Sequence, residues 1–550
     1  MPLNNHASNL SFNLGTLALD GFLSTHGVVN LLNIPYATIS ARFKPASLVD
    51  PSFLQGRRDA CHYGPQCPQL YDKLHCLMAH MFEELSVSHH SHELDCLHLN
   101  VYAPPSALSP PNPSKMPVLV WIHGGSFNTG NNATEFDGNH LVKRSMDLGK
   151  PIVVVTINYR LNIWGFLSSQ ELIDEARESG EVPILNQGLN DQAIALEWVQ
   201  QNISHFGGHA SRVTVAGESA GAGSIFYLLK QGVPLFSRAI ICSSPQLSFR
   251  KISDGQQIFN TLVQHAGIDA SASYQTKLQA IRSYKAEDLL VIFPSFPVAF
   301  PIEDPNWFVD WNPDKISSGE YWAELPPWCS EIIIGHMKDE AALFLNPTYP
   351  SDLTKEEALN HVQHIIPDPR PAEIALSTLQ PDVDSSPFRS VLALATHRLF
   401  ITPNLELATR VASHPNHKIY LYSIDIADGF TNQLGGYAWH SFGNSIFFYQ
   451  PACRTRPELA ATADKLSDAY TTFIYGDKGP TWEEFSEKGR MMSWNGNRTG
   501  LVHVGLDWKD PVPERLAANG MRDWIDVYRR DGWKITFPVP GVCRPRPLKG

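Results

Sequence analysis

Cysteine, long apolar runs and positive charge are all scarce in this sequence. Its eight cysteines among 550 residues are too few for a disulfide scaffold, and none of them forms the Cys-x-x-Cys pair of a structural zinc site. No apolar run approaches the length that spans a bilayer. The formal net charge of −12 argues against a nucleic-acid or anionic-membrane partner, because either would require a basic surface. With 43% hydrophobic and 18% charged residues, the composition is typical of a globular enzyme.

Targeting signals are also missing from the sequence. The first residues contain neither the basic nor the apolar segment of a secretory signal peptide. The last four residues, Pro-Leu-Lys-Gly, match no peroxisomal or retention tail. We therefore expect a cytoplasmic protein, with secretion as the alternative.

The most informative stretch runs from Val213 to Gly221. Four apolar or β-branched residues predict a buried strand that ends at Gly217, and a helix is predicted from Ala220 onwards. Between them lies Gly-Glu-Ser-Ala-Gly, a Gly-x-Ser-x-Gly pattern with Ser219 at its centre. A strand that turns directly into a helix strains its middle residue and lifts that side chain clear of the backbone, so the flanking residues must be small. We therefore predict that Ser219 is a nucleophile.

Further strands are predicted by short apolar runs. Residues 14–40 suggest antiparallel strands at a sheet edge, and residues 250–330 are mainly helical and irregular. Near-continuous apolar runs, typical of strands covered on both faces, occur at Val118–Ile122, Ile152–Ile157, Glu331–Gly335 and Lys418–Ile424. Strands that alternate with helices indicate a largely parallel sheet with helices on both faces. We expect residues 1–550 to form a single α/β domain with long insertions.

The groups that would assist Ser219 lie beyond other predicted strands, at the carboxyl ends where reacting groups gather in open α/β sheets. His440 follows one such strand and is the predicted general base, which takes the serine proton and returns it to the leaving alcohol. Glu340 follows another strand and would orient the imidazole of His440. The adjacent Asp339 is the alternative acid.

The turn His123-Gly124-Gly125-Ser126 is predicted to stabilise the negative charge that develops in the reaction. It is similar to the HGGG-type turn, whose backbone N–H groups donate to an oxyanion. Glycine lets the backbone approach the substrate with no side chain in the way. The partner donor would be the N–H of Ala220, the residue after the nucleophile.

Together these motifs resemble the type-B carboxylesterase and cholinesterase-like family of α/β-hydrolases, which includes fungal lipases and esterases. The resemblance covers roughly residues 15 to 530. Besides the Ser219 turn, the stretches that carry it are Asp95–Val101, Val118–Phe127, Asn158–Leu161 with Gly165–Leu167, Asn186–Gln192, Phe206–Gly221 and Lys338–Glu340. The resemblance implies an α/β-hydrolase fold.

The resemblance also implies roles for individual residues. Ser219, Glu340 and His440 would form the catalytic triad, which selects Glu340 over Asp339. Glu218 would be a buried carboxylate that supports the site from behind. The oxyanion-hole residues would be Gly125, Ser126 and Ala220 as N–H donors, with Gly124 shaping the turn.

Cys67 and Cys96 match the pair that closes a loop over the active-site entrance in this family. The resemblance therefore implies a possible disulfide, whereas a cytosolic protein would usually keep both thiols reduced. The enclosed loop would form an apolar lid or pack against the body of the protein through Leu74, Leu77, Met78, Met81 and Phe82.

The sequence thus predicts a serine hydrolase that acts on small-molecule carboxylic esters through an acyl-enzyme. An acyltransferase or a lipase would use the same triad. A non-catalytic binding protein of the same fold is a third alternative, although such relatives typically lose the nucleophile or one of its partners. No metal or organic cofactor is implied, because the triad needs neither, and the His-rich residues 89–92 are interpreted as a solvated loop.

Overall fold

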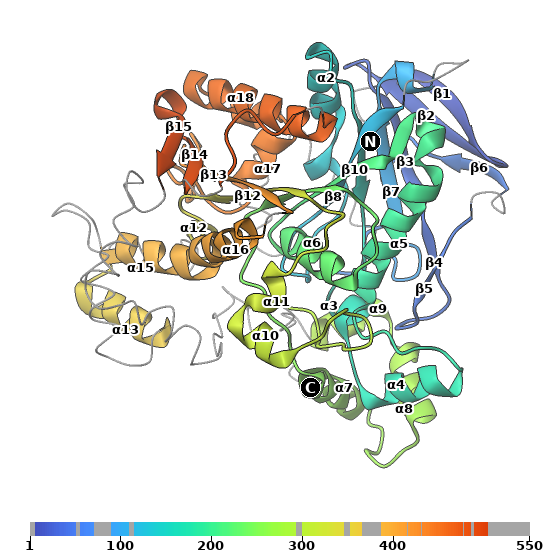
Figure 1. Ribbon diagram of the computed structural model, residues 1–550. Helices are drawn as coiled ribbons and strands as arrows, with labels where there is room; N and C mark the ends of the chain where they lie inside the picture. Colours follow the sequence, from blue (N-terminus) through green and yellow to red (C-terminus); the bar gives the residue numbers. More distant parts are fainter. Residues whose placement is uncertain are drawn as a thin grey trace.

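The computed structural model describes residues 6–50, 55–70, 90–108, 115–292, 300–345, 353–365, 387–414, 416–430, 432–476, 478–485 and 489–503. A sheet of 13 strands runs through the molecule in the order β1-β2-β3-β7-β9-β8-β10-β11-β12-β13-β14-β15, with β6 paired to β2 (Figure 1). Its strands are β1 (His6–Leu14), β2 (Leu17–Ser24), β3 (Val29–Pro35), β6 (Gly56–Asp59), β7 (His98–Ala103), β8 (Met116–Ile122), β9 (Val153–Ile157), β10 (Gly208–Glu218), β11 (Arg238–Cys242), β12 (Glu331–Met337), β13 (Lys418–Ile424), β14 (Arg490–Trp494) and β15 (Gly500–His503). A separate two-stranded sheet joins β4 (Ala37–Ile39) to β5 (Ala46–Leu48).

The central part of the large sheet is parallel, as the apolar runs predicted. All strands from β9 to β14 in the sheet order pair in parallel. The strands β1, β2, β3 and β7 are antiparallel to their neighbours in that order, which confirms the antiparallel edge expected for residues 14–40. The strand β15 is antiparallel to β14 at the other edge.

Alternating side chains of β8 enter two different cores. Every residue of this strand is buried. Val118, Val120 and Ile122 join the core that contains the apolar residues of α5 (Gln187–Asn202) and α6 (Ala220–Gln231). Leu119 and Trp121 point the other way, into the core beneath α18 (Pro457–Tyr475). This period of two follows from the pleat of a strand, and it requires helices on both faces of the sheet.

Figure 1 shows the remaining helices around this sheet. They are α2 (Asn139–Asp147), α3 (Asn162–Phe166), α4 (Gln170–Glu178), α7 (Ile252–His265), α8 (Tyr274–Ser283), α9 (Ala286–Ile292), α10 (Pro313–Ser318), α11 (Glu320–Ala323), α12 (Ala342–Leu345), α13 (Lys355–Ile365), α15 (Pro387–Thr396), α16 (Thr402–Ala412) and α17 (Phe442–Phe447). A π-helical turn, His397–Ile401, joins α15 to α16. The helices α7 to α11 confirm the mainly helical character expected for residues 250–330.

The carboxyl ends of the parallel strands lie at one edge of the sheet because the strands are in register. Ile122 of β8 pairs with Gly217 of β10, and the next residue, Glu218, pairs with Cys242 of β11. The strands β12 and β13 likewise end opposite each other. The segments that follow β8, β10, β12 and β13 therefore meet at this edge.

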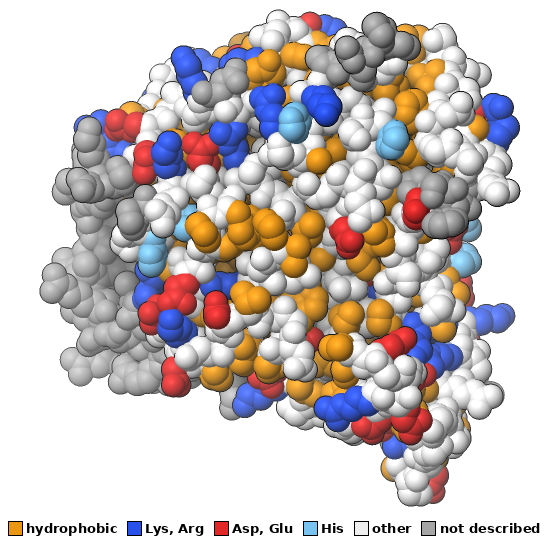
Figure 2. Space-filling view, turned by 45° about the vertical axis from the view of Figure 1, so that its right-hand side comes forward, with side chains coloured by type: hydrophobic (Ala, Val, Ile, Leu, Met, Phe, Trp, Pro, Cys, Tyr) orange, Lys and Arg blue, Asp and Glu red, His pale blue; other side chains and the backbone are white. Residues whose placement is uncertain are grey.

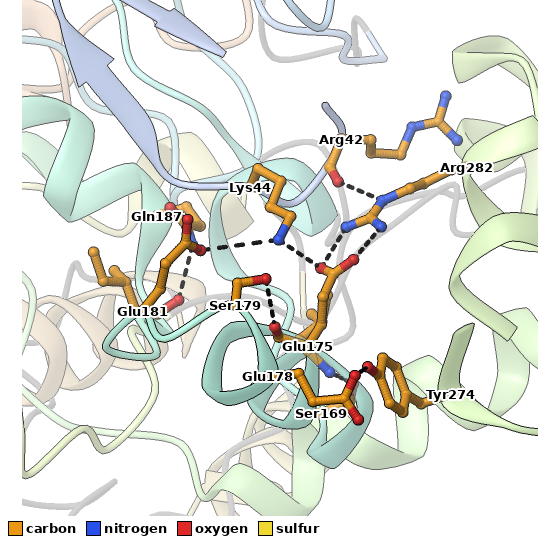
Figure 3. Close-up of polar contacts among 12 residues, drawn as sticks. Arg42, Lys44, Ser169, Glu175, Glu178, Ser179, Glu181, Gln187, Tyr274 and Arg282 are labelled. Atoms are coloured by element: carbon orange, nitrogen blue, oxygen red, sulfur yellow. Dashed lines mark hydrogen bonds and ion pairs between the residues drawn. The ribbon is translucent and has the colours of Figure 1, made fainter. Parts of the chain in front are cut away.

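An ion-pair cluster away from that edge joins α4 to α8 (Figure 3). Arg282 of α8 forms two bonds with the carboxylate of Glu175 of α4, at 2.6 and 2.8 Å. The Lys44 ammonium lies between two carboxylates, 3.3 Å from Glu175 and 3.9 Å from Glu181. We call these four residues the peripheral cluster. It attaches the α4–α8 pair to the loop before β5.

The outer surface carries both signs of charge. On the face drawn in Figure 2, basic and acidic side chains are interspersed, with an apolar band between them. Within the described ranges, no helix is long and apolar enough to cross a bilayer. The lid residues proposed between positions 74 and 82 lie outside the described residues.

Candidate active site

The predicted strand-to-helix turn is present at Ser219. The strand β10 ends at Glu218 and α6 begins at Ala220, so Ser219 joins them with φ 56° and ψ −122°. This conformation is unfavourable for a side chain larger than glycine and persists only where the surroundings impose it. A Cβ atom on Gly221 would lie 2.1 Å from the Ile122 carbonyl oxygen, so a glycine is required there. The predicted strain and the need for small neighbours are both observed.

Glu340 and His440 meet at the same edge of the sheet. The Nδ1 atom of His440 lies 2.6 Å from Oε2 of Glu340, and both side chains are buried. The other carboxylate oxygen of Glu340 accepts a bond from the N–H of Met337 at 2.7 Å. Glu340 is therefore held by its own turn and faces the imidazole.

The neighbouring Asp339 has a different partner. Its carboxylate accepts a bond from the N–H of Ala438 at 3.0 Å, and its own N–H donates to the carbonyl of Ala438 at 2.9 Å. These bonds tie the turn after β12 to the loop that carries His440. Of the two acids that the sequence offered, Glu340 is the one whose side chain contacts the histidine.

The second ring nitrogen of His440 lies close to Glu218, the residue before Ser219. Its Nε2 atom lies 3.1 Å from Oε1 of Glu218, yet it has no hydrogen-bond partner among the described residues. Ser441 donates its hydroxyl to the same Glu218 oxygen at 2.8 Å, and Asn444 donates to the other oxygen at 3.4 Å. Glu218 thus lies between His440 and the start of α17, directly before Ser219 in the chain.

Burial and charge shift the pKa values of these groups. Burial raises the pKa of Glu218, against the opposing effect of a charged His440. Burial by itself lowers the pKa of His440, but the carboxylates of Glu218 and Glu340 outweigh it, so the pKa of this histidine is raised overall. The two carboxylates therefore stabilise the imidazolium form of His440 once it has taken a proton.

Two aromatic rings flank His440, and no sequence pattern indicated them. The Phe400 ring lies 4.6 Å and the Phe344 ring 5.3 Å from the imidazole, measured between ring centroids. Phe344 belongs to α12 and Phe400 to the π-helical turn, a distortion of helices that is frequent at functional sites. Ser441 and Asn444 were also missed, although their spacing after His440 would have placed them on one side of a predicted helix.

The turn after β8 lies against Ser219. A Cβ atom on Gly124 would lie 2.7 Å from the carbonyl oxygen of Glu218 and 3.0 Å from Cβ of Ser219. Gly125 and Ser126 both have left-handed backbones, with φ values of 103° and 54°. Ala220 is the first residue of α6, where N–H groups lack a partner within the helix. The candidate donors Gly125 and Ser126 therefore follow a glycine that packs against Ser219, and the candidate donor Ala220 follows Ser219 in the chain.

The structure has Cys67 and Cys96 as free thiols, so the possible disulfide is absent from it. Both side chains are buried. The pKa of Cys96 is raised by a hydrogen bond to Cys67 and by burial. The two thiols are therefore neighbours in space, as the possible disulfide requires, and the disulfide itself stays a prediction.

Comparisons with known proteins agree on one group of enzymes. The model of the carboxylesterase family matches residues 19–499. The chain is 31% identical to the para-nitrobenzyl esterase of Bacillus subtilis, over 73% of this chain and 75% of that protein. It is 30% identical to the acylcarnitine hydrolase of Mus musculus, over 90% and 86%.

The matches to lipases cover a smaller part of this chain. The match to a solved structure covers nearly all of it. Lipase 2 of Geotrichum candidum is 34% identical over 58% of this chain, and the chain spans only 57% of its length. The chain spans 45% of the length of lipase 1 of that organism. A solved structure described as a thermophilic PNB esterase matches with a TM-score of 0.69 and 25% identity, over 92% of this chain and all of the other.

Proposed function

Because the chain belongs to the carboxylesterase family, we propose that it hydrolyses carboxylic esters through Ser219, His440 and Glu340. Family membership and the fold match confirm the α/β-hydrolase fold expected from the sequence. The observation that carries the proposal is the 2.6 Å contact between His440 and Glu340, two buried residues 100 positions apart. A buried histidine held by a carboxylate beside a strained serine is the arrangement that activates a hydroxyl nucleophile.

In the first half of the reaction, Oγ of Ser219 attacks the carbonyl carbon of the ester while Nε2 of His440 takes the hydroxyl proton. Glu340 accepts the Nδ1–H bond and stabilises the imidazolium that forms. The bond from the carbonyl carbon to the alcohol oxygen then breaks. The alcohol leaves with the proton from His440, and the acyl group remains on Ser219.

In the second half, water replaces the alcohol. His440 takes a proton from the water, whose oxygen attacks the acyl carbon. The bond to Ser219 breaks, the carboxylic acid leaves, and Ser219 regains its proton from the imidazolium. An acyltransferase would differ only in that an alcohol would attack in place of water.

The negative charge of each tetrahedral intermediate would be held by the N–H groups of Gly125, Ser126 and Ala220. The compression of Gly124 against Glu218 and Ser219 supports this role, because it sets the turn beside the attacking oxygen. Removal of one such donor typically lowers kcat by about 10²- to 10³-fold.

The test is hydrolysis of p-nitrophenyl esters from acetyl to decanoyl by the wild type and by Ser219→Ala. Ser237→Ala is the matched control, because Ser237 lies at the opposite end of the parallel strands and, among the described residues, its hydroxyl donates to the Val213 carbonyl. We expect the wild type and the control to release nitrophenol and Ser219→Ala to be inactive. The acyl length that the wild type prefers also shows whether the esterase relatives or the lipase relatives are the better guide to its substrate.

A fluorophosphonate probe separates a narrow substrate range from an inactive protein. Ser219 would bond to phosphorus and fluoride would leave, with no need for the natural ester. Labelling of the wild type without ester turnover would support the nucleophile and point to another acyl acceptor. A folded wild type with neither turnover nor labelling would refute the proposal and favour the binding-protein alternative.

A further inference from the structure

The oxyanion turn contains three consecutive residues with left-handed backbones. Gly125, Ser126 and Phe127 have φ values of 103°, 54° and 58°. Two of the three carry side chains, for which this conformation is unfavourable. Such a turn keeps its shape only where other contacts hold it, so the groups that hold it control where its N–H donors point.

One segment holds both ends of this turn. Residues 158–162 follow β9, the neighbour of β8 in the sheet. The Tyr159 hydroxyl donates to the carbonyl of His123 at 2.9 Å, just before the turn. The N–H of Asn162 donates to the carbonyl of Phe127 at 2.7 Å, at the end of the turn. The strained residues therefore lie between two fixed carbonyl groups.

Tyr159 makes two kinds of contact with His123. Besides the hydroxyl bond, the two rings stack with their centroids 4.4 Å apart and their planes 19° apart. Tyr159 is fully buried, and burial raises its pKa well above the usual range, so its hydroxyl stays protonated and remains a donor. The ring fixes the histidine, and the hydroxyl fixes the peptide that leads into Gly124.

We propose that Tyr159 is a positioning residue for the oxyanion turn, through the bond from its hydroxyl to the His123 carbonyl. This inference rests on the proposed function, because it assigns Tyr159 a part in that reaction. The His123 carbonyl and the Gly124 N–H belong to one peptide unit. A rotation of this peptide would turn the adjacent donors at Gly125 and Ser126 away from the oxyanion.

The Tyr159 bond should affect the chemical step more than substrate binding. The reason is that negative charge develops on the carbonyl oxygen only as the tetrahedral intermediate forms. A ground-state ester gains little from well-aimed N–H groups, whereas the tetrahedral intermediate depends on them. Loss of the Tyr159 hydroxyl should therefore lower kcat and leave KM nearly unchanged.

The matched pair of variants is Tyr159→Phe and Tyr321→Phe. Tyr321 is also fully buried, and its hydroxyl also donates to a backbone carbonyl, that of Val309, at 2.9 Å. We expect Tyr159→Phe to lower kcat about tenfold with KM within about twofold, since it acts indirectly on donors that are each worth about 10²-fold or more. Its affinity for a trifluoromethyl ketone, which mimics the tetrahedral intermediate, should fall by the same factor. Tyr321→Phe should keep wild-type kcat.

A second variant tests the strain directly. Ser126→Gly keeps the backbone N–H and removes the penalty of the left-handed conformation. In the Ser126→Gly background, the kcat loss caused by Tyr159→Phe should shrink to about threefold or less. A merely structural tyrosine would show the same loss in both backgrounds.

The possible outcomes are distinguishable. Unchanged kcat in Tyr159→Phe, or equal losses of kcat and thermal stability in both tyrosine variants, would overturn the inference while ester hydrolysis by the wild type still stands. If Tyr159→Phe is less stable, assays below its unfolding temperature and the Ser126→Gly comparison still test whether Tyr159 positions the oxyanion turn. An inert wild type that no fluorophosphonate labels would overturn the proposed function and this inference together.

Discussion

Glu175 in the peripheral cluster and Glu218 in the active site are both carboxylates with charged neighbours, yet their pKa values shift in opposite directions. Hydrogen bonds from Arg282 lower the pKa of Glu175. Burial raises the pKa of Glu218. The first carboxylate has the cations Arg282 and Lys44 beside it (Figure 3), whereas the second forms its one ion pair among the described residues with His440, which is charged only when protonated.

The two regions therefore differ in how their carboxylate charges are balanced. The peripheral cluster joins secondary structure elements with charges that are already balanced. The active site places Glu218 and Glu340 against one imidazole, and among the described residues no lysine or arginine forms an ion pair with either. The positive charge that would balance these carboxylates arises only when His440 takes a proton. Such preorganised charge is a usual source of catalytic power.

The largest predicted contrast is between Glu340→Gln and Glu175→Gln. The first change removes the acceptor of the His440 Nδ1–H bond and the charge that stabilises the imidazolium, so kcat should fall about 10⁴-fold. The second change should leave kcat within about twofold of wild type, as is usual for surface substitutions. Steady-state kinetics on p-nitrophenyl esters measure both. A Glu340→Gln enzyme with nearly full kcat would exclude the proposed triad.

Packing provides the next contrast. Gly124→Ala would place a Cβ atom 2.7 Å from backbone and carboxylate oxygens of Glu218, so the oxyanion turn must move and kcat should fall by about 10² or more. Gly180, at the end of α4, has nothing within 4 Å of such an atom but has φ +70°. Gly180→Ala should therefore keep wild-type kcat and reduce the free energy of unfolding by about 1 kcal/mol. Kinetics and denaturant unfolding of both variants decide this.

The pH profile tests the link between Glu218 and His440. The negative charge of Glu218 favours the imidazolium and so raises the pKa of His440. In Glu218→Gln this pKa falls, the neutral base persists to lower pH, and the acidic limb of kcat/KM should move to lower pH. The Glu175→Gln profile should overlay that of wild type. An acidic limb that stays in place or moves upward would contradict this coupling.

The smallest predicted effects are on stability, and they have opposite signs. Because the pKa of Glu218 is raised on folding, its ionisation opposes folding as pH rises, and Glu218→Gln should increase the free energy of unfolding at neutral pH. The lowered pKa of Glu175 stabilises the fold above its unfolded-state pKa, and this contribution is lost as pH falls through the folded-state value. Glu175→Gln should therefore lose about 0.5 kcal/mol at neutral pH, and less in high salt. Denaturant unfolding at two salt concentrations measures both, and equal signs would refute the comparison.

Most of the parallel sheet could be predicted from the sequence, because each central strand is a short apolar run. The strand at Lys418–Ile424 has the predicted bounds, and the Ser219 turn lies where its glycines place it. The parallel strands β11 and β14 and the antiparallel strand β15 were not predicted. The order of strands could not be predicted either, because it depends on contacts between segments that lie up to 95 residues apart in the chain.

Residues of the site could be predicted where a local sequence pattern determines them. They could not be predicted where packing between distant segments determines them. The sequence offered both Asp339 and Glu340 as the acid, because adjacent carboxylates have the same local pattern. Their roles separate only through the bonds of Asp339 to Ala438, which exist once two loops meet. Phe400 could not be predicted as a neighbour of His440 for the same reason.

The most direct test of the central claim is mass spectrometry of the protein after reaction with a fluorophosphonate, followed by digestion. The account predicts one adduct, on the peptide that contains Ser219, in the wild type and in Glu175→Gln. It predicts much slower labelling in Glu340→Gln, because His440 would lose its orienting carboxylate. An adduct on another residue, or labelling of Glu340→Gln at the wild-type rate, would contradict the assignment of Ser219, His440 and Glu340 as one catalytic unit.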